Sequence, residues 1–92
     1  MKIKKSHKYL INLQIILEYI AKDKLSASKK FYQKLEKQIK DLSNFPYKYR
    51  KSIYFNDKNI RDMIFEGYTI IYEIKNDKII VLNIFNQNKG LK

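Results

Sequence analysis

The sequence predicts an α+β fold in which a two-helix antiparallel hairpin packs on a small curved antiparallel β-sheet. Two segments in the first half repeat apolar residues every three or four positions, as amphipathic helices do. From residue 60 onward the pattern changes to apolar–polar alternation interrupted by turn residues, which is typical of strands. A chain of 92 residues has the length of one domain, so we expect residues 1–92 to form a single domain.

The first helix is predicted after a short apolar–polar segment around Ile3, which we expect to be an edge strand. Ser6 stands where a helix N-cap belongs. The helix is expected to end near residues 22–24. Its predicted apolar stripe consists of Tyr9, Leu10, Leu13, Ile16, Leu17 and Ile20.

The second helix is predicted to begin at a cap formed by Ser26 or Ser28. A linker of about four residues then separates the helices, which favours an antiparallel hairpin. Pro46 marks the end of the helix, because the residue before a proline is pushed out of the helical region. The predicted apolar stripe consists of Ala27, Phe31, Leu35, Ile39 and Leu42.

The second half of the chain predicts strands at residues 60–66, 68–74 and 78–85, with a turn or bulge at Gly67 and a turn at residues 76–77. Before them, residues 47–59 form a basic aromatic connection in which residues 53–55 can add a short strand. The last strand is apolar on both sides, as a central strand would be. We expect Ile80, Leu82 and Ile84 to share one of its faces.

The charge of the chain is +11 and is unevenly distributed. Residues 1–51 hold 14 Lys/Arg and 4 Asp/Glu, which places nearly all of the excess on the helical half. Such a field attracts polyanions such as nucleic acid or an acidic protein. The plain alternative is that these lysines only solubilise exposed helix faces.

Composition excludes several classes of site and location. The chain has no cysteine and a single histidine, His7, so we expect no disulfide, no metal and no cofactor. No apolar run approaches the roughly 20 residues of a membrane span. The N-terminal segment lacks the apolar core of a signal peptide. We therefore expect a cytoplasmic protein without a membrane partner.

Arg61 is the first candidate functional residue, because it is one of only two arginines among 20 cationic residues. Arginine offers a rigid fork for a carboxylate or a phosphate. The alternative is an internal salt bridge to Asp62, Glu66 or Glu73. Asp62 and Glu66 lie four residues apart in a predicted strand, where paired carboxylates can serve acid–base chemistry or simply form a solvated strand face.

A basic aromatic cluster at residues 47–51 supplies the second group of candidates. It contains Tyr47, Lys48, Tyr49 and Arg50. Tyrosines can stack on bases while cations hold phosphates. The alternative is an exposed loop whose tyrosines pack on the edge of the sheet.

The order of these features resembles the RelE/ParE superfamily of bacterial toxin–antitoxin toxins. The resemblance covers nearly the whole chain, and it implies two helices over a curved sheet. It also implies a growth-inhibiting toxin that is neutralised by a cognate antitoxin. The basic field of the helical half predicts that this antitoxin carries an acidic C-terminal segment. The residues that carry the resemblance are Leu42-x-x-Phe45-Pro46, Ile60-Arg61, Gly67 to Tyr72, and Asn86-Gln87-Asn88-Lys89.

The resemblance implies one of two targets. RelE-like members cleave mRNA on the ribosome, and ParE-like members bind and poison DNA gyrase. RelE-like members usually carry arginine where this chain has Thr69, and many carry a histidine or tyrosine where it has Asn86 and Gln87. Neither amide can act as a general base near neutral pH. The resemblance therefore favours a ParE-like gyrase inhibitor that is not an enzyme.

Two alternatives stay open. The first is a RelE-like, ribosome-dependent mRNA endonuclease, in which Arg61, Lys89 and Tyr72 would be catalytic. The second is a non-toxic, small basic module that binds nucleic acid. In the favoured reading, the expected target-binding residues are Arg61, Asn86, Gln87, Lys89, Lys48 and Arg50, and the expected antitoxin-binding residues are Leu13, Leu17, Lys30 and Lys34.

Overall fold

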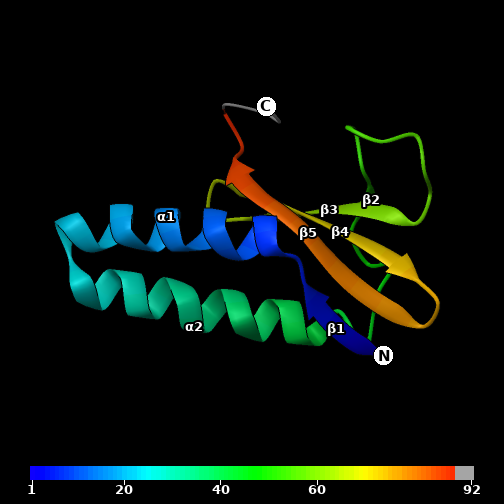
Figure 1. Cartoon of the computed structure of the whole chain (residues 1–92), viewed down its shortest axis with the longest axis horizontal. Helices are drawn as coiled ribbons and strands as arrows, with labels where there is room; N and C mark the ends of the chain where they lie inside the picture. Colours follow the sequence, from blue (N-terminus) through cyan, green and yellow to red (C-terminus); the bar gives the residue numbers. More distant parts are fainter. Residues whose placement is uncertain (89–92) are drawn as a thin grey trace.

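The computed structural model describes residues 1–88 and confirms the α+β class, with two helices packed on one side of a five-stranded sheet (Figure 1). The strands lie in the order β1-β5-β4-β3-β2. The elements are β1 (Lys2–Lys5), α1 (His7–Asp23), α2 (Leu25–Asp41), β2 (Arg50–Lys51), β3 (Ile60–Phe65), β4 (Tyr68–Lys75) and β5 (Lys78–Asn86).

The sheet is antiparallel except at its first strand. β1 runs parallel to β5, from the pair Lys2↔Lys78 to the pair Lys5↔Val81, so the sheet is mixed rather than wholly antiparallel. The Ser6 N–H continues this pairing with a 2.9 Å hydrogen bond to the Val81 carbonyl. Because parallel neighbours are joined through long connections, this pairing leaves no local signal in the sequence.

Helix α1 begins where the sequence predicts. Ser6 is its N-cap, and the Ser6 Oγ accepts a 3.1 Å hydrogen bond from the Tyr9 N–H. The predicted stripe is narrower than expected, because Leu10 is 47% exposed while Tyr9 and Leu13 are buried. Leu10 lies one residue beyond Tyr9, about 100° around the helix, and so turns away from the core. Within residues 1–88, neither helix is long and apolar enough to cross a membrane.

Helix α2 follows α1 almost without a break, so the predicted linker is wrong. Only Lys24 separates the two helices, and it caps α2 without a side-chain hydrogen bond. Ser28 is not a cap. Its hydroxyl is buried between the helices and donates a 2.8 Å hydrogen bond to the Leu17 carbonyl of α1. The predicted apolar stripe is confirmed at its main positions, where Phe31, Leu35, Ile39 and Leu42 are buried.

The two predicted hairpin turns are confirmed. Glu66 and Gly67 join β3 to β4 with φ values of 46° and 86°. Asn76 and Asp77 join β4 to β5 with φ values of 51° and 57°. Positive φ at both central residues matches the right-handed twist of the flanking strands.

A β-bulge in β5 changes which side chains face the helices. Ile71 pairs with Asn83 and Tyr72 with Val81, so Leu82 is an extra residue on β5. An extra residue shifts the alternation of a strand by one. The core therefore receives Ile79, Val81 and Ile84. The prediction that Ile80, Leu82 and Ile84 share one face is wrong for this reason.

The predicted strand at residues 53–55 does not form. The strand in this connection is β2, in which Arg50 pairs with Asp62 of β3. Beyond it the chain bends over the sheet: the Tyr54 ring meets the Phe85 ring edge-on, with centroids 5.3 Å apart. Tyr54 thus packs against the sheet, and the loop does not extend it.

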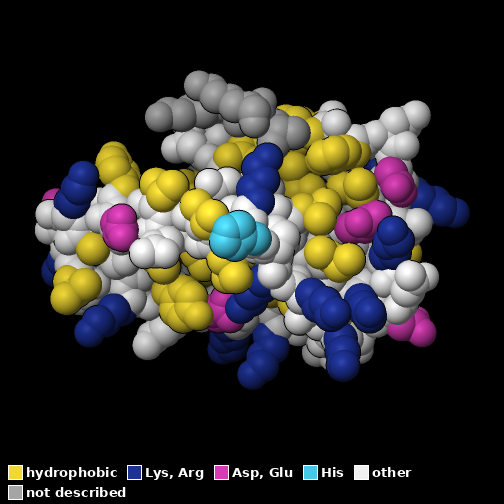
Figure 2. Space-filling view, in the orientation of Figure 1, with side chains coloured by type: hydrophobic (Ala, Val, Ile, Leu, Met, Phe, Trp, Pro, Cys, Tyr) yellow, Lys and Arg dark blue, Asp and Glu magenta, His cyan; other side chains and the backbone are white. Residues whose placement is uncertain are grey.

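The surface carries the charge that the sequence indicates. Lysine and arginine side chains gather along the border where α2 and β1 lie (Figure 2). One of these lysines is bound: Lys5 of β1 reaches both carboxylate oxygens of Glu36 in α2, at 2.7 and 2.6 Å. This pair ties the edge strand to the helical hairpin.

Candidate functional site

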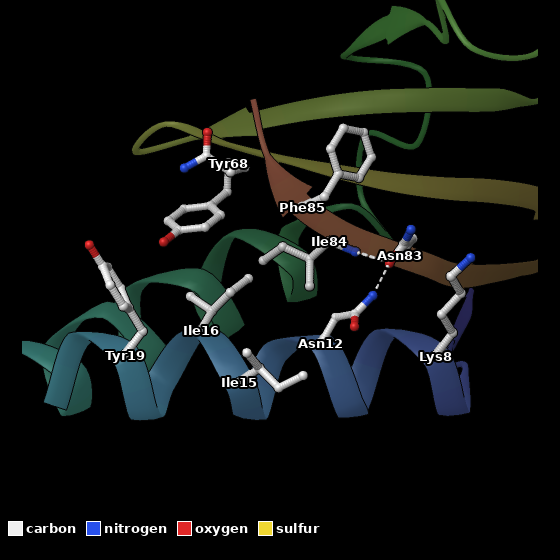
Figure 3. A pocket seen from close by; sticks show the side chains of 10 residues that line it. Lys8, Asn12, Ile15, Ile16, Tyr19, Tyr68, Asn83, Ile84 and Phe85 are labelled. Carbon is white, nitrogen blue, oxygen red and sulfur yellow. Dashed lines mark hydrogen bonds between the residues drawn. The ribbon is translucent and has the colours of Figure 1, made fainter. Parts of the chain in front are cut away.

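A groove of about 560 Å³ lies between α1 and the end of β5 (Figure 3). Tyr19 of α1 and Tyr68 of β4 point toward each other across it, and Ile84 points from β5 toward α1. Tyr19 is 70% exposed and Ile15 is 59% exposed, so both offer apolar surface to a partner. This α1–β5 groove is lined by Lys8, Asn12, Ile15, Ile16, Tyr19, Tyr68, Asn83, Ile84, Phe85 and Asn86.

A pair of asparagines lies in the α1–β5 groove, next to the bulge in β5. The Asn83 Oδ1 accepts a 2.7 Å hydrogen bond from the Asn12 Nδ2 and a 2.9 Å bond from the Ile84 N–H. Asn83 is buried and lies at the bulge. Sequence reasoning missed this pair, although an asparagine inside an otherwise apolar strand is the signal that could have found it.

A second groove adjoins the first through Tyr68. It lies between the helices and the β3–β4 turn and is lined by Ile20, Ala27, Lys30, Phe31, Lys34, Glu66 and Tyr68. Burial raises the pKa of the Tyr68 hydroxyl, and the nearby Tyr19 adds to this shift. Tyr68 is therefore a neutral hydrogen-bonding group at the junction of the two grooves.

The residues predicted to bind an antitoxin separate into two kinds. Lys30 and Lys34 are exposed and line the second groove. Leu13 is only 4% exposed and belongs to the core, and Leu17 is partly buried against it. The expectation of Leu13 as an anchor needs correction, because its side chain is already used in packing the hairpin on the sheet.

Arg61 lies in a basic aromatic cluster at the start of β3. Its Nε and Nη1 donate 3.0 Å hydrogen bonds to the carbonyls of Lys58 and Tyr49. Its guanidinium lies 4.9 Å from the centroid of the Tyr47 ring. Within residues 1–88 it forms no salt bridge, so the alternative of an internal pairing with Asp62, Glu66 or Glu73 is not what the structure shows.

Asp62 is bound by the other arginine. The Arg50 Nη2 lies 3.3 Å from the Asp62 Oδ2, which also accepts a 3.1 Å bond from the Ile53 N–H. Asp62 is buried, whereas Glu66 is exposed in the β3–β4 turn. The predicted pair of carboxylates on one strand face therefore does not exist, and Asp62 instead holds the loop that covers the sheet.

Tyr72 has no exposed surface, which corrects its suggested role in a nuclease. Its hydroxyl donates a 2.7 Å hydrogen bond to the Pro46 carbonyl. Burial raises the pKa of the Tyr72 hydroxyl and outweighs the opposing effect of the nearby Arg61 guanidinium. A buried, neutral and hydrogen-bonded hydroxyl is a structural anchor rather than a proton-transfer group.

The residues predicted to bind a target do not form one cluster. Arg61 lies at the start of β3, at one end of the sheet, whereas Arg50 of β2 pairs with Asp62 on the opposite face of the sheet, and Lys48 lies against Asp41 of α2. Asn86 pairs with Tyr68 at the other end, where the Gln87 N–H donates a 2.8 Å bond to the Gly67 carbonyl. The five residue steps of β3 between these ends span roughly 15 Å. Lys89, also predicted, lies outside the described residues.

The helical hairpin covers one face of a mixed five-stranded sheet, and grooves run along the hairpin. This arrangement places the protein in the class of RelE/ParE-like α+β folds. Among solved structures it is similar to a chain of the chromosomal ParDE TA system from P. aeruginosa, with a TM-score of 0.78 and 21% sequence identity. That match covers 94% of this chain and 95% of the other. No curated protein matches the sequence.

The family itself is identified from the sequence. The model of the family described as the ParE toxin of the type II toxin–antitoxin system, parDE, matches residues 3–90. The chain belongs to this ParE toxin family. The resemblance drawn from the sequence, including its ParE-like branch, is thereby confirmed.

Proposed function

We propose that this chain is a bacterial toxin that arrests growth by binding DNA gyrase and that a cognate antitoxin neutralises it. The observation that carries the proposal is the family match over residues 3–90. ParE-like members of the superfamily act on gyrase, and RelE-like members act on ribosome-bound mRNA. Both targets lie in the cytoplasm, where we expect the protein to work.

The geometry favours gyrase binding over RNA cleavage. A metal-free nuclease needs groups that exchange protons with the reacting 2′-hydroxyl and the leaving oxygen. Tyr72 is buried and neutral, and Thr69, which is fully buried, stands where RelE-like members carry an arginine. Asn86 and Gln87 do not titrate. The proposed activity is therefore recognition through a surface, without acid–base chemistry.

Arg61 is the proposed centre of target recognition. The guanidinium carries five N–H donors, of which the Lys58 and Tyr49 carbonyls engage two. The remaining donors are held in a fixed plane by these bonds and by the Tyr47 ring. A preorganised fork binds a carboxylate or a phosphate with little loss of side-chain entropy.

Two exposed cations lie on the segment that precedes β3. Lys48, which lies against Asp41 of α2, and Arg50, which pairs with Asp62 on the opposite face of the sheet from Arg61, would draw an acidic target surface toward this end of the molecule. Asn86 and Gln87, at the opposite end of the sheet, provide a second, uncharged contact in the proposal. The expected Lys89 contact belongs to the same proposal.

The two grooves along the hairpin are the proposed antitoxin site. An amphipathic helix binds a groove through apolar side chains spaced three, four and seven residues apart. Ile15 and Tyr19 of the α1–β5 groove offer the apolar surface for such a helix. Lys8 in that groove, with Lys30 and Lys34 in the next, would pair with the carboxylates of an acidic segment.

Two assays on purified protein test the choice of target. The protein is incubated with gyrase and relaxed plasmid, and separately with ribosomes translating a defined mRNA. We expect supercoiling to fall with rising protein concentration while the mRNA stays intact. Codon-specific cuts in the mRNA together with unaffected supercoiling would overturn the proposal in favour of the mRNA endonuclease.

A further inference from the structure

The outer face of α2 carries a charge excess that the fold leaves uncompensated. Five lysines lie on the helix: Lys29, Lys30, Lys34, Lys37 and Lys40. Both carboxylates of α2 are paired with lysines from other elements, Glu36 with Lys5 at 2.6 Å and Asp41 with Lys48 at 3.9 Å. Within residues 1–88, none of the five helix lysines forms a salt bridge.

At the C-terminal end of α2 this surface becomes a polar groove of about 500 Å³. The groove combines three ammonium groups with two side-chain amides. The Tyr49 hydroxyl donates a 3.2 Å hydrogen bond to the Gln38 Oε1, which leaves the Gln38 amide N–H groups as free donors. This α2 lysine groove is lined by Lys37, Gln38, Lys40, Asp41, Asn44, Lys48 and Tyr49.

The balance of charge in the α2 lysine groove favours an anion. The C-terminal end of a helix, which α2 presents at this groove, contributes roughly half a negative charge. Asp41 contributes one more, so the negative total stays below that of the three lysines. Asp41 is also half-exposed and only loosely paired, at 3.9 Å from the Lys48 Nζ, which therefore can turn to another anion. Amide donors such as those of Gln38 and Asn44 commonly bind phosphate oxygens.

The shape and chemistry of the surface indicate which anion. From Lys30 to Lys40 the lysines extend over about 15 Å of helix, at 1.5 Å per residue. Duplex DNA presents one phosphate charge per roughly 1.7 Å of its axis, so a row of cations meets several phosphates at once. A single strand would need aromatic side chains on which bases stack. The one aromatic ring in the groove, that of Tyr49, is half-buried and packed on the core.

We propose that the α2 lysine groove binds the phosphate backbone of duplex DNA. Lys37, Lys40 and Lys48 supply the charge, and the Gln38 and Asn44 amides donate hydrogen bonds to phosphate oxygens. Because these contacts go to phosphates, which carry no sequence information, we expect the binding to be independent of sequence. The groove itself lies at the opposite end of α2 from Lys30, whereas the lysine row that leads to it includes Lys30 and Lys34 of the second antitoxin groove. The binding also does not depend on gyrase, since the protein alone makes these contacts.

Fluorescence anisotropy of a short labelled DNA duplex tests the proposal with the purified protein alone, made by cell-free synthesis. The wild type is compared with the triple variant Lys37→Gln, Lys40→Gln and Lys48→Gln. The matched control is Lys22→Gln, Lys58→Gln and Lys75→Gln, which removes the same charge from exposed sites elsewhere. Circular dichroism and thermal unfolding verify that both variants are folded.

Each neutralised phosphate contributes about −0.9 to the slope of log affinity against log salt concentration. The groove variant should therefore bind about tenfold or more weakly at low salt and lose about two to three units of slope. The control should keep most of the wild-type affinity and slope. Equal losses in the two variants would reduce the effect to net charge and overturn the proposal. Tighter binding of a single strand or of polyglutamate than of the duplex would overturn it as well.

Discussion

The hydroxyl of Tyr72 donates a 2.7 Å hydrogen bond to the backbone carbonyl of Pro46. This bond ties the buried centre of β4 to the loop that leaves α2. The same loop carries Tyr47, whose ring lies 4.9 Å from the Arg61 guanidinium, and Tyr49, whose carbonyl accepts a 3.0 Å hydrogen bond from the Arg61 Nη1. The position of the basic aromatic cluster therefore depends on a side chain that never reaches the surface.

The substitution Tyr72→Phe separates this anchoring role from a catalytic one. It removes the hydrogen bond to Pro46 and should lower the free energy of unfolding by about 0.5–1.5 kcal/mol. Inhibition of gyrase should persist at concentrations where the variant is folded. Denaturant unfolding and a supercoiling assay on the same preparation provide the two measurements. Full loss of activity in a variant of normal stability would restore a direct role for Tyr72.

Arg61 should tolerate replacement by lysine no better than by alanine. Lysine keeps the charge, but it cannot bind the Lys58 and Tyr49 carbonyls while presenting a planar fork to a partner. Both variants should lower the apparent affinity for gyrase by about tenfold or more. Lys58→Gln is the control, because it removes a neighbouring exposed charge and leaves the carbonyl that Arg61 binds. Wild-type inhibition by Arg61→Lys would show that charge alone is enough.

Asn86 and Gln87 should contribute less than Arg61. Each alanine substitution removes hydrogen bonds worth about 0.5–1.5 kcal/mol, which corresponds to at most about tenfold in affinity. Titration of gyrase inhibition by Asn86→Ala and Gln87→Ala measures this loss. A complete loss of activity from either substitution, with the fold intact, would indicate a catalytic role and contradict the recognition mechanism.

The antitoxin site predicts that a charge placed in the α1–β5 groove weakens neutralisation but not toxicity. Ile15→Asp introduces a carboxylate at a 59% exposed position, where the antitoxin would have to bury it. Ile53→Asp, at a 67% exposed position on the loop over the other face of the sheet, is the control. Co-expression with the antitoxin should rescue growth for the control and fail for Ile15→Asp. Equal rescue of growth for both variants would indicate that the antitoxin binds another surface.

Periodicity in the sequence was enough to predict both helices, the three long strands and their two turns. These features are local: the apolar stripe of α2 and the Gly67 turn follow from residues near one another in the chain. The features that it did not predict depend on distant partners. The parallel pairing of β1 needs β5, and the bulge at Leu82 is defined by the pairing of β5 with β4.

The candidate site shows the same division. The sequence singled out Arg61 and the cluster at residues 47–51 as separate candidates, and the fold brings Tyr47 and Tyr49 of that cluster against Arg61. It could not indicate that Arg50, rather than Arg61, pairs with Asp62, because alternate residues of β3 face opposite sides of the sheet. It also could not show that Tyr72 is sealed from solvent. The α1–β5 groove joins elements far apart in the chain, so only the packed fold presents it.

The stability of the protein should fall at alkaline pH, because two buried tyrosines remain protonated in the fold. Burial raises the pKa of both the Tyr9 and the Tyr72 hydroxyls above the ordinary value of about 10. Above pH 10 the unfolded chain therefore releases protons that the native chain keeps. The free energy of unfolding then decreases by about 1.4 kcal/mol per pH unit for each such tyrosine. The two tyrosines contribute fully to the free energy of unfolding below pH 10. This contribution is lost as the pH rises toward the pKa values of the two hydroxyls in the folded protein.

Denaturant unfolding between about pH 9 and 11 measures this loss, and Tyr72→Phe assigns part of it. Phenylalanine cannot ionise in either state. The free energy of unfolding of the variant should therefore fall less steeply above pH 10 than that of the wild type, by about 1.4 kcal/mol per pH unit. Tyr19→Phe, at a 70% exposed position, is the matched control and should keep the wild-type slope. Ultraviolet absorbance of tyrosinate follows the same event directly, since Tyr9 and Tyr72 should ionise only as the protein unfolds. Identical slopes for the wild type and Tyr72→Phe would mean that Tyr72 ionises equally in both states, contrary to its burial and its bond to Pro46.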